Sequence, residues 1–571
     1  MTTQARATDH SQDADAPWVE LYPRTAPATL TGGFPSMLEA WRAHVDSRPD
    51  APSVHYFDRT LTFAQIDAAA DALAGALARE GIGAGDRIAV YLQNDPQWLV
   101  TVLSAWKIGT IPTSVNPMLR AEELRHILVD SGAVALICLD SLYDVVAEVR
   151  GEAALRTVVT THPLDMTPDA TVPAGIAPHI PERRAVPGTI DWRDAVGTGQ
   201  SAPARSSAAA GPTTVETSTD AIACLTYTSG TTGRSKGAMN THRAMVHSST
   251  VYTRWWDLHP DRDVIIGLAP VFHITGLVAV LGIHIISGAP VALMHRFDAE
   301  EILGAIERHR ATFVIGASTA FIALTNHPAL ATTDVSSLTK TPSGGAAVSQ
   351  ALVDRVHSAT GWTLRGAYGM TETTSPTHLG PPDATPPTDP DSGALSVGVP
   401  VPGARVRIVS TTDGSDLPPG EVGEIVVSGP MVVPGYWESP EESEHAIRDG
   451  WLHTGDLGKV TEEGWLFVID RMKDLINAGG YKVVPRDVED VLYQHPAVRE
   501  ACVVGVPDEY RGETVRAFVS LVPGAEATTE ELMEFCRERM AAYKYPRAVI
   551  LLEELPKNAS GKLLRRELRD A

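Results

Sequence analysis

Residues Tyr227–Gly237 read YTSGTTGRSKG and directly follow the apolar run AIACLT at residues 221–226. Small serine, threonine and glycine residues let several backbone N–H groups converge on one anion, and the hydroxyls add further donors. Lys236 adds a cation near the end of the stretch. The G-x-x-x-x-G-K-[ST] spacing of a Walker A loop is found neither here nor elsewhere in the chain. The stretch therefore predicts a phosphate-binding loop of another type, with a flexible Gly/Ser/Thr turn as the alternative.

Strands and helices alternate along the chain as far as about residue 370. Apolar residues recur at helical spacing in residues 36–47 and in the Ala-rich stretch 61–82, whereas RIAVYL at 87–92 has the composition of a strand. A further helix is expected at residues 97–109. This alternation is typical of α/β folds, in which helices cover both faces of parallel sheets.

No Asp, Glu, Lys or Arg occurs from Val264 to His295. These 32 residues would be long enough to cross a bilayer. However, prolines, glycines and two histidines interrupt the apolar surface. The stretch instead predicts a strand at 265–269, a helix at 273–286 and a strand at 289–294, all within a buried core and with no membrane span.

The remaining chain divides by composition. Residues 1–30 are expected to form a loose tail, and the Gly/Ser/Ala/Pro-rich residues 197–219 a flexible connector. From about 395 to 470 short strands and turns predict a smaller β unit. We therefore predict an α/β protein with a large N-terminal domain over residues 1–470. A compact α+β domain should follow over residues 471–571.

The composition excludes several classes of protein. With 43% hydrophobic and 20% charged residues, the 571-residue chain is typical of a globular enzyme. Its 70 acidic and 47 basic residues give a net charge of −23, so a basic nucleic-acid-binding face is not expected. No two of the four cysteines lie within five residues of each other, which argues against zinc-ribbon and CxxC sites and fits a reducing cytoplasm. The polar N-terminal stretch carries no secretory-signal pattern.

Four further motifs follow the loop: YGMTE at Tyr368–Glu372, WLHTGD at Trp451–Asp456, DRMKDLINAGGYKVVP at Asp470–Pro485 and PKNASGK at Pro556–Lys562. In this order, and with PVFHITG at Pro270–Gly276, the motifs resemble those of acyl-CoA synthetases, nonribosomal adenylation domains and firefly luciferase. The resemblance spans roughly residues 35–570. Within it, residues 479–518 look most like bacterial acyl-CoA ligases of the fatty-acid type, and we expect no carrier-protein domain after the last motif.

The resemblance implies a fold and a reaction. The large domain would hold stacked αβαβα sheets and a small β-barrel-like unit, and the small C-terminal domain would be mobile. A carboxylic acid would attack the α-phosphorus of Mg·ATP to give an acyl adenylate and pyrophosphate. The thiol of coenzyme A would then displace AMP. The implied acid is a medium- or long-chain fatty acid or a related hydrophobic acid, and the implied cofactors are ATP, Mg²⁺ and coenzyme A.

The resemblance also assigns the nucleotide site. Its expected residues are Thr228, Ser229, Gly230, Thr231, Thr232, Gly233, Lys236, Gly344, Gly345, Ala346, Tyr368, Gly369, Met370, Thr371, Glu372, Asp456, Arg471, Lys482 and Lys562. Glu372 would bind Mg²⁺ with Thr228, because a lone carboxylate among phosphates suits that ion. Tyr368 would stack on the adenine, beside Gly344–Ala346, and Asp456 would accept hydrogen bonds from the ribose.

Five of these residues are expected to be catalytic: Lys562, Glu372, Thr228, Lys236 and Arg471. Lys562 would bridge the α-phosphate and the acyl carboxylate during adenylation, because both groups are anions. Arg471 would pair with the ribose or a phosphate. Lys482 would reach the phosphates in one orientation of the small domain.

The acid and the thiol have their own expected sites. The acid would contact His273, Gly316, Thr319, Gly345 and Thr373, and coenzyme A would pass Gly479, Gly480 and Tyr481. Lys473 would be the hinge on which the small domain turns. The segment GASTAF at Gly316–Phe321 lacks the Pro-Thr pair that is frequent in the family, which leaves the identity of the acid open.

Each assignment has a plainer alternative. A lone histidine such as His273 is often a satisfied core residue, Asp456 could only form a turn, and Asp470 with Arg471 could form a surface ion pair. Two other functions stay open. One is an adenylating enzyme that passes an unusual acid to a carrier protein, an amine or another acceptor, and the other is a non-catalytic nucleotide-binding protein. The sequence does not decide between a monomer and a homodimer.

Overall fold

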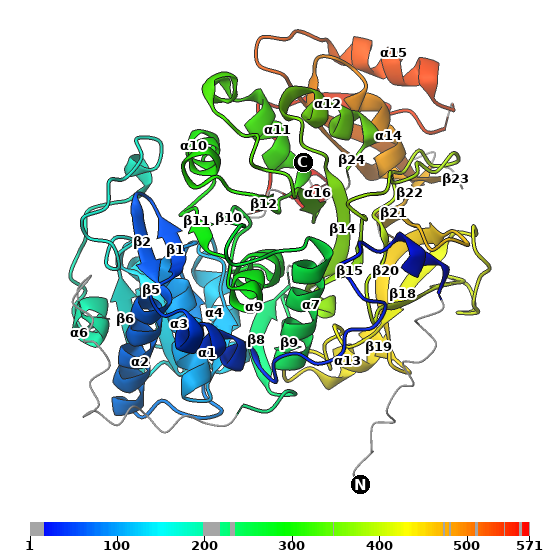
Figure 1. Ribbon diagram of the computed structural model, residues 1–571. Helices are drawn as coiled ribbons and strands as arrows, with labels where there is room; N and C mark the ends of the chain where they lie inside the picture. The colour runs from blue at the N-terminus through cyan, green and yellow to red at the C-terminus, as the bar shows by residue number, and fades with distance from the viewer. Residues whose placement is uncertain are drawn as a thin grey trace.

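The computed structural model describes residues 16–197, 217–228, 234–345, 348–471, 474–478, 481–508, 512–541, 543–558 and 562–569. Most of the predicted connector, residues 197–219, lies outside this set. So do Ser229, Gly230, Thr231, Thr232, Gly233, Ala346, Lys473, Gly479 and Gly480. Within it, the sequence folds into an α/β body followed by a small C-terminal unit, as predicted (Figure 1).

The first sheet has seven strands in the order β7-β6-β5-β3-β4-β8-β9. All neighbouring strands are parallel except the hairpin β8–β9. The strands are β3 (Arg87–Tyr91), β4 (Ile111–Ser114), β5 (Ala135–Leu139), β6 (Thr157–Thr161), β7 (Ile190–Asp191), β8 (Ile222–Tyr227) and β9 (Gly237–Thr241). Helices α2 (Phe63–Arg79), α3 (Pro96–Lys107), α4 (Ala121–Ser131), α5 (Tyr143–Val149) and α6 (Trp192–Val196) accompany it.

Helix α2 begins two residues later than predicted. Leu61 and Thr62 belong to strand β2 (Arg59–Thr62), and the Thr62 side chain accepts from the backbone N–H of Gln65. The Gln65 side chain in turn accepts from the N–H of Thr62. This reciprocal capping fixes Phe63 as the first helical residue.

The second sheet contains the uncharged stretch. Its order is β12-β10-β11-β1-β2, with β1 (Pro52–Tyr56), β10 (Ile265–Gly267), β11 (Val291–Leu293) and β12 (Phe313–Val314). Between β10 and β11 run α8 (Ile274–Gly276), a π-helical segment (Leu277–Gly282) and α9 (Ile283–Ser287). The predicted strand–helix–strand is therefore confirmed. Among the described residues, no helix is long and apolar enough to cross a membrane.

Helices of this core pack together at the centre of the large domain. Figure 1 shows α7 (His242–Trp255) beside α9, and α1 (Met37–Ser47) also contacts α9. Two more helices, α10 (Ala299–His309) and α11 (Ser318–Asn326), lead to the third sheet. Its strands β13 (Pro342–Gly344), β14 (Arg365–Met370), β15 (Ser375–Leu379) and β16 (Val399–Pro400) pair in sequence order, with α12 (Gln350–Thr360) between β13 and β14.

The predicted β unit follows. It contains β17 (Arg405–Val409), β18 (Gly423–Ser428), β19 (Ile447–Arg448), β20 (Trp451–Val460) and β21 (Leu466–Arg471), with the short helix α13 (Pro440–Ala446). The C-terminal unit has a sheet of β22 (Ile476–Ala478), β23 (Tyr481–Val483), β24 (Val498–Asp508), β25 (Gly512–Leu521) and β26 (Ala548–Leu551). Its helices are α14 (Pro485–Tyr493), α15 (Thr529–Arg539) and α16 (Arg565–Arg569). Apolar residues from β22 to β26 form a core of their own.

Part of the expected loose tail is packed against the body. Residues Pro17–Leu21 form a 3₁₀ turn, and a Cβ at Gly464 would lie 2.6 Å from the ring of Trp18. The Tyr22 hydroxyl donates to the carbonyl of Pro400 at 2.6 Å. This segment therefore runs across the large domain to the β unit, as the dark-blue trace in Figure 1 shows, which the polar composition of the tail did not indicate.

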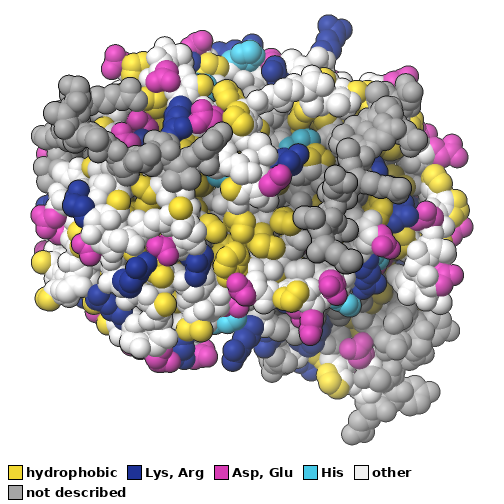
Figure 2. Space-filling model, turned by 90° about the horizontal axis from the view of Figure 1, so that it is seen from below, with side chains coloured by type: hydrophobic (Ala, Val, Ile, Leu, Met, Phe, Trp, Pro, Cys, Tyr) yellow, Lys and Arg dark blue, Asp and Glu magenta, His cyan; other side chains and the backbone are white. Residues whose placement is uncertain are grey.

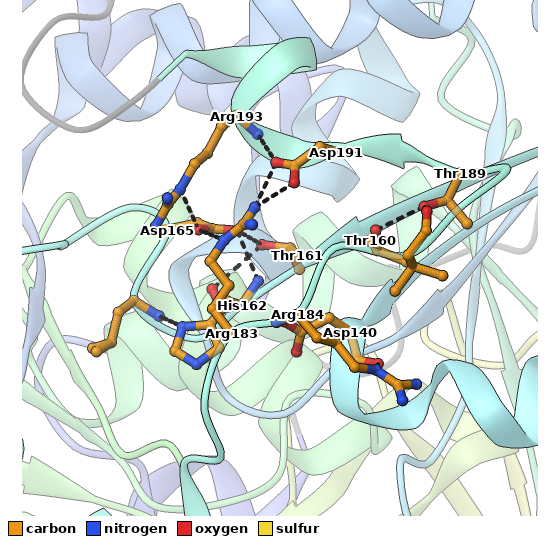
Figure 3. Close-up of polar contacts among 12 residues, drawn as sticks. Asp140, Thr160, Thr161, His162, Asp165, Arg183, Arg184, Thr189, Asp191 and Arg193 are labelled. Carbon is orange, nitrogen blue, oxygen red and sulfur yellow. Dashed lines mark hydrogen bonds and ion pairs between the residues drawn. The ribbon is translucent and has the colours of Figure 1, made fainter.

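A buried ion network closes the edge of the seven-stranded sheet (Figure 3). The fully buried carboxylate of Asp165 accepts from Arg183 Nε at 2.9 Å and from Arg193 Nε at 2.8 Å. Arg183 also donates to both oxygens of Asp191, at 2.5 and 2.6 Å. The network thus fastens the loop after β6 to β7 and α6.

We expect Asp165→Ala to lower the free energy of unfolding by about 3 kcal/mol, because it removes the buried carboxylate that pairs with both Arg183 and Arg193 and leaves Arg183 with Asp191 alone. Asp194→Ala, which removes an exposed carboxylate from α6 beside Arg193, is the control. Urea unfolding followed by fluorescence measures both. Equal stability of the two variants would contradict a structural role for the network.

Candidate active site

The predicted phosphate loop connects two strands whose ends are fixed. Tyr227 pairs with Gly237, and the N–H of Thr228 donates to the carbonyl of Lys236 at 3.0 Å. The Tyr227 hydroxyl donates to Asp130 at 2.5 Å. A Cβ at Gly237 would lie 3.1 Å from the Tyr227 ring, so glycine allows this close packing. The loop therefore leaves and rejoins the sheet at rigid positions.

Glu372 lies in the turn Thr371–Thr373 between β14 and β15. The buried amide of Asn240, on β9, donates to the carbonyl of Thr371 and to the hydroxyl of Thr374, both at 3.0 Å. Thr374 and Ser375 have φ of 47° and 80°, values that non-glycine residues rarely adopt. Asn240 thus holds this strained turn against β9, beside the phosphate loop.

Thr373 serves the same turn. Its hydroxyl donates to the carbonyls of Met370 at 3.1 Å and Ser375 at 2.8 Å, and it accepts from the Met370 N–H at 2.9 Å. Thr373 is also buried. The structure therefore gives the Thr373 hydroxyl a role in shaping the turn, and contact with the acid stays a prediction.

The side chains of Glu372 and Lys236 meet two residues that the sequence did not single out. The Tyr436 hydroxyl donates to Glu372 Oε1 at 2.7 Å, and burial together with this carboxylate raises the pKa of Tyr436. Lys236 forms an ion pair with Glu442, and its ammonium lies 5.3 Å from the centre of the Tyr436 ring. The segment PGYWESPEE carries no pattern of catalytic residues, so only the fold could reveal these contacts.

The donor set suits Mg²⁺ but not a metal held by protein alone. Among the described residues, no group of three or more His, Cys, Asp or Glu side chains could hold a metal ion. Mg²⁺ usually keeps several waters and is bound by one or two carboxylates together with substrate phosphates. Glu372, with Thr228 at the start of the phosphate loop, fits that mode of binding.

The expected adenine and ribose residues converge on neighbouring strands. Gly344, at the end of β13, pairs with Ala367 on β14, and Gly345 follows with φ of 79°. The Tyr368 hydroxyl donates to Asp456 Oδ2 at 2.8 Å. Asp456 on β20 is the cross-strand partner of Arg471 on β21. The structure therefore brings together residues that are more than 100 positions apart in the sequence.

The expected acyl residues border this site. Gly316 forms a parallel bridge with Ser343, and its carbonyl accepts from the N–H of Gly344 at 3.1 Å. Thr319 lies in the first turn of α11. Gly316 thus joins the segment expected to contact the acid directly to β13, the strand expected to border the adenine.

His273 is the N-cap residue of α8, and its ring accepts from the N–H of Thr275 at 3.5 Å. Two features fix the segment around it. A Cβ at Gly276 would lie 2.1 Å from the Pro270 carbonyl oxygen, so only glycine fits. The buried amide of Asn94 binds the carbonyls of Gly267 and Ala269 and the N–H of Val271, at 2.9 to 3.2 Å. Asn94, which the sequence did not single out, therefore positions the loop that carries His273.

Lys562 lies near the C-terminal end of the sequence, yet its charge reaches His273 in the large domain. Burial and, next, the charge of Lys562 lower the pKa of His273 to about 4. Arg565, at the start of α16, donates to both oxygens of Glu489 at 2.7 Å and to Asp470 at 3.3 Å. Because Asp470 belongs to β21 and Glu489 to α14, Arg565 links the two domains close to Lys562. Lys473, the expected hinge, and Gly479 and Gly480, expected on the path of coenzyme A, lie outside the described residues, and Tyr481 and Lys482 begin β23.

The lowered pKa of His273 predicts how the stability of the folded protein depends on pH. Between pH 6.5 and about 4 the unfolded chain binds a proton at this residue that the folded chain resists, so acidification favours unfolding. We expect the melting temperature to fall less between pH 7.5 and 5 in His273→Asn than in the wild type. An unchanged dependence on pH would mean that His273 is protonated in the folded protein.

Comparisons with known proteins agree with this geometry. The family model described as AMP-binding enzyme matches residues 41–437, and the model of the AMP-binding enzyme C-terminal domain matches residues 487–562. A long-chain-fatty-acid–CoA ligase of Bacillus subtilis is 36% identical over 553 residues, or 97% of each chain. A feruloyl-CoA synthase of Amycolatopsis is 33% identical over 91% of this chain and 96% of its own. The structure of an anthranilate CoA ligase with anthranoyl-AMP superimposes with a TM-score of 0.82 at 26% identity, covering 95% of this chain and 98% of that one.

Proposed function

Because the chain belongs to the family of AMP-binding enzymes and is an acid–CoA ligase of the AMP-forming type, we propose that its acid is a medium- or long-chain fatty acid. The observation that carries this proposal is the uncharged stretch Val264–His295, which contains His273 and lies close to Gly316. A wall without charged side chains suits an alkyl chain and offers no partner to a second carboxylate. The Bacillus relative named for long-chain fatty acids supports the same class.

An aromatic acid is the second candidate. The similarity to a feruloyl-CoA synthase and to an anthranilate CoA ligase favours it, because an aromatic ring also suits an apolar wall. Pyrophosphate release with octanoate, laurate, palmitate, ferulate, anthranilate and malonate separates the possibilities. We expect the highest kcat/KM with one of the fatty acids and no activity with malonate. Preference for ferulate or anthranilate would replace the fatty acid by an aryl acid.

In the first step we assign the phosphates of ATP to the loop Thr228–Lys236 and the ribose to Asp456. Lys562 would lie between the α-phosphate and the acid, two anions that must approach each other. A carboxylate oxygen of the acid forms the new bond to the α-phosphorus, the bond from that phosphorus to the oxygen that bridges the α- and β-phosphates breaks, and pyrophosphate leaves with the electron pair. Mg²⁺, held through Glu372 and Thr228, would supply positive charge to the phosphates. His273, neutral at pH 7, adds no charge beside the acid.

In the second step the thiolate of coenzyme A attacks the acyl carbon and AMP leaves. We assign the thiol path to Gly479–Gly480 and the turning point between the two steps to Lys473. The Arg565 link to Asp470 supports assigning the present orientation to adenylation, because it holds the small domain with Lys562 toward the large-domain site. Release of coenzyme A-bound product, measured beside pyrophosphate release, distinguishes this acceptor from a carrier protein or an amine.

Lys562→Ala tests the adenylation step. We expect the rate of pyrophosphate release to fall by about 10²- to 10³-fold, because a cation set in place for the transition state is lost. Thioester formation from a supplied acyl adenylate should stay close to the parental rate, since the α-phosphate is then already esterified. Equal loss in both half-reactions would contradict this role of Lys562.

A further inference from the structure

Four side chains around the phosphate loop form one connected cluster, made of Lys236, Tyr436, Glu372 and Glu442. Tyr436 stands in the middle, because its hydroxyl donates to Glu372 at 2.7 Å and its ring lies 5.3 Å from the Lys236 ammonium. Glu442, on α13, pairs with the same ammonium. Two of the residues expected to hold MgATP therefore have partners in the segment 436–442, to which no role has been assigned.

The backbone fixes Tyr436 on both sides. The N–H of Trp437 donates to the carbonyl of Gly237 at 2.7 Å, and the N–H of Met239 donates to the carbonyl of Gly435 at 3.1 Å. On its other side the N–H of Tyr436 donates to the hydroxyl of Ser443 at 2.8 Å. The phenol is therefore held rigidly against the strand that follows the phosphate loop, and rigid support is what orients a ligand-binding side chain.

The side chain of Glu442 is held less firmly than that of Tyr436. Its side chain is 51% exposed, and that of Lys236 is 26% exposed. The hydrogen bond from Lys236 and the positive charge of its ammonium lower the pKa of Glu442, so this carboxylate is ionised near neutral pH. Exposed ion pairs contribute little free energy, so a polyphosphate can replace the Glu442 carboxylate at Lys236.

We propose that Tyr436 is a positioning residue for MgATP and that Glu442 is a built-in competitor of the ATP phosphates for Lys236. Tyr436 orients the Glu372 carboxylate through its hydroxyl and steadies the Lys236 ammonium through its ring. Glu442 holds Lys236 beside the loop and lowers the affinity for ATP until phosphate oxygens take its place. This inference rests on the proposed function, since it assumes that ATP binds at Lys236 and Glu372.

The competitor is tested by the dissociation constant of MgATP, measured by calorimetry without acid or coenzyme A. We expect Glu442→Gln to bind MgATP about two- to fivefold more tightly than the wild type, and the difference to shrink at high salt. Glu441→Gln is the matched control, because it removes the same charge from α13 and Glu441 forms no ion pair among the described residues. In a Lys236→Met background, Glu442→Gln should leave the dissociation constant of MgATP unchanged, because there is no ammonium for which Glu442 and the phosphates compete.

The positioning role is tested by the same binding measured over a range of Mg²⁺ concentrations. Tyr436→Phe keeps the ring and loses only the hydroxyl, so about tenfold more Mg²⁺ should be needed for half-maximal ATP binding. Tyr436→Leu loses the ring as well and should weaken binding further at saturating Mg²⁺. Melting temperatures of the free variants, which should stay near that of the wild type, separate this effect from a loss of folding.

Each outcome has a distinct meaning. A wild-type chain that binds no MgATP would contradict the proposed function itself. If the wild type binds but Glu442→Gln binds equally or more weakly, Glu442 is no competitor. A Tyr436→Phe variant that folds normally and has the Mg²⁺ dependence of the wild type would overturn the positioning role.

Discussion

The amide of Asn240 joins two parts of the chain on which the whole site depends. It is buried on β9, and its N–H groups hold the turn that carries Glu372 through Thr371 and Thr374. Because β9 begins where the phosphate loop ends, this contact sets the carboxylate beside Lys236. The strained backbone at Thr374 and Ser375 persists because the surrounding contacts determine it. Because the Asn240 amide donates to two groups of the same turn, it fixes both the orientation of the turn and its distance from β9.

The acyl side of the site is built by the same means. Asn94 binds three backbone groups of the loop before His273, and Gly276 lets the following helix pack directly on the Pro270 carbonyl. Both contacts shape a segment that contains no charged residue. The neutral His273 fits these surroundings, because burial disfavours its charged form. The candidate site thus combines polar side chains beside the phosphate loop with an uncharged segment around His273. Figure 2 shows one face of the molecule, with apolar side chains in its central part.

Polar contacts link the small domain to the last strand of the large one. Arg565 spans from Glu489, in the small domain, to Asp470, at the end of the large one. The bidentate pair with Glu489 keeps Arg565 within its own domain, and the longer contact with Asp470 is the weaker of the two. Arg486 on α14 adds two further links to β21, from its N–H to Asp470 at 3.4 Å and from its guanidinium to the carbonyl of Val468 at 2.9 Å.

Much of this protein follows from the sequence alone. The alternation of strands and helices and the uncharged core element predicted the α/β fold. The order of five motifs, through its resemblance to acyl-CoA synthetases, predicted an AMP-forming ligase and assigned Lys236, Glu372, Asp456 and Lys562 to one expected site. These features are local, since each depends on a few neighbouring residues and on the small set of backbone conformations that they allow. Tyr436, Glu442, Asn94, Asn240 and Arg565 were not predictable in this way, nor was the packing of residues 16–30. Their roles depend on partners that lie tens to hundreds of positions away, and only the folded chain brings a phenol, a carboxylate and an ammonium within bonding distance.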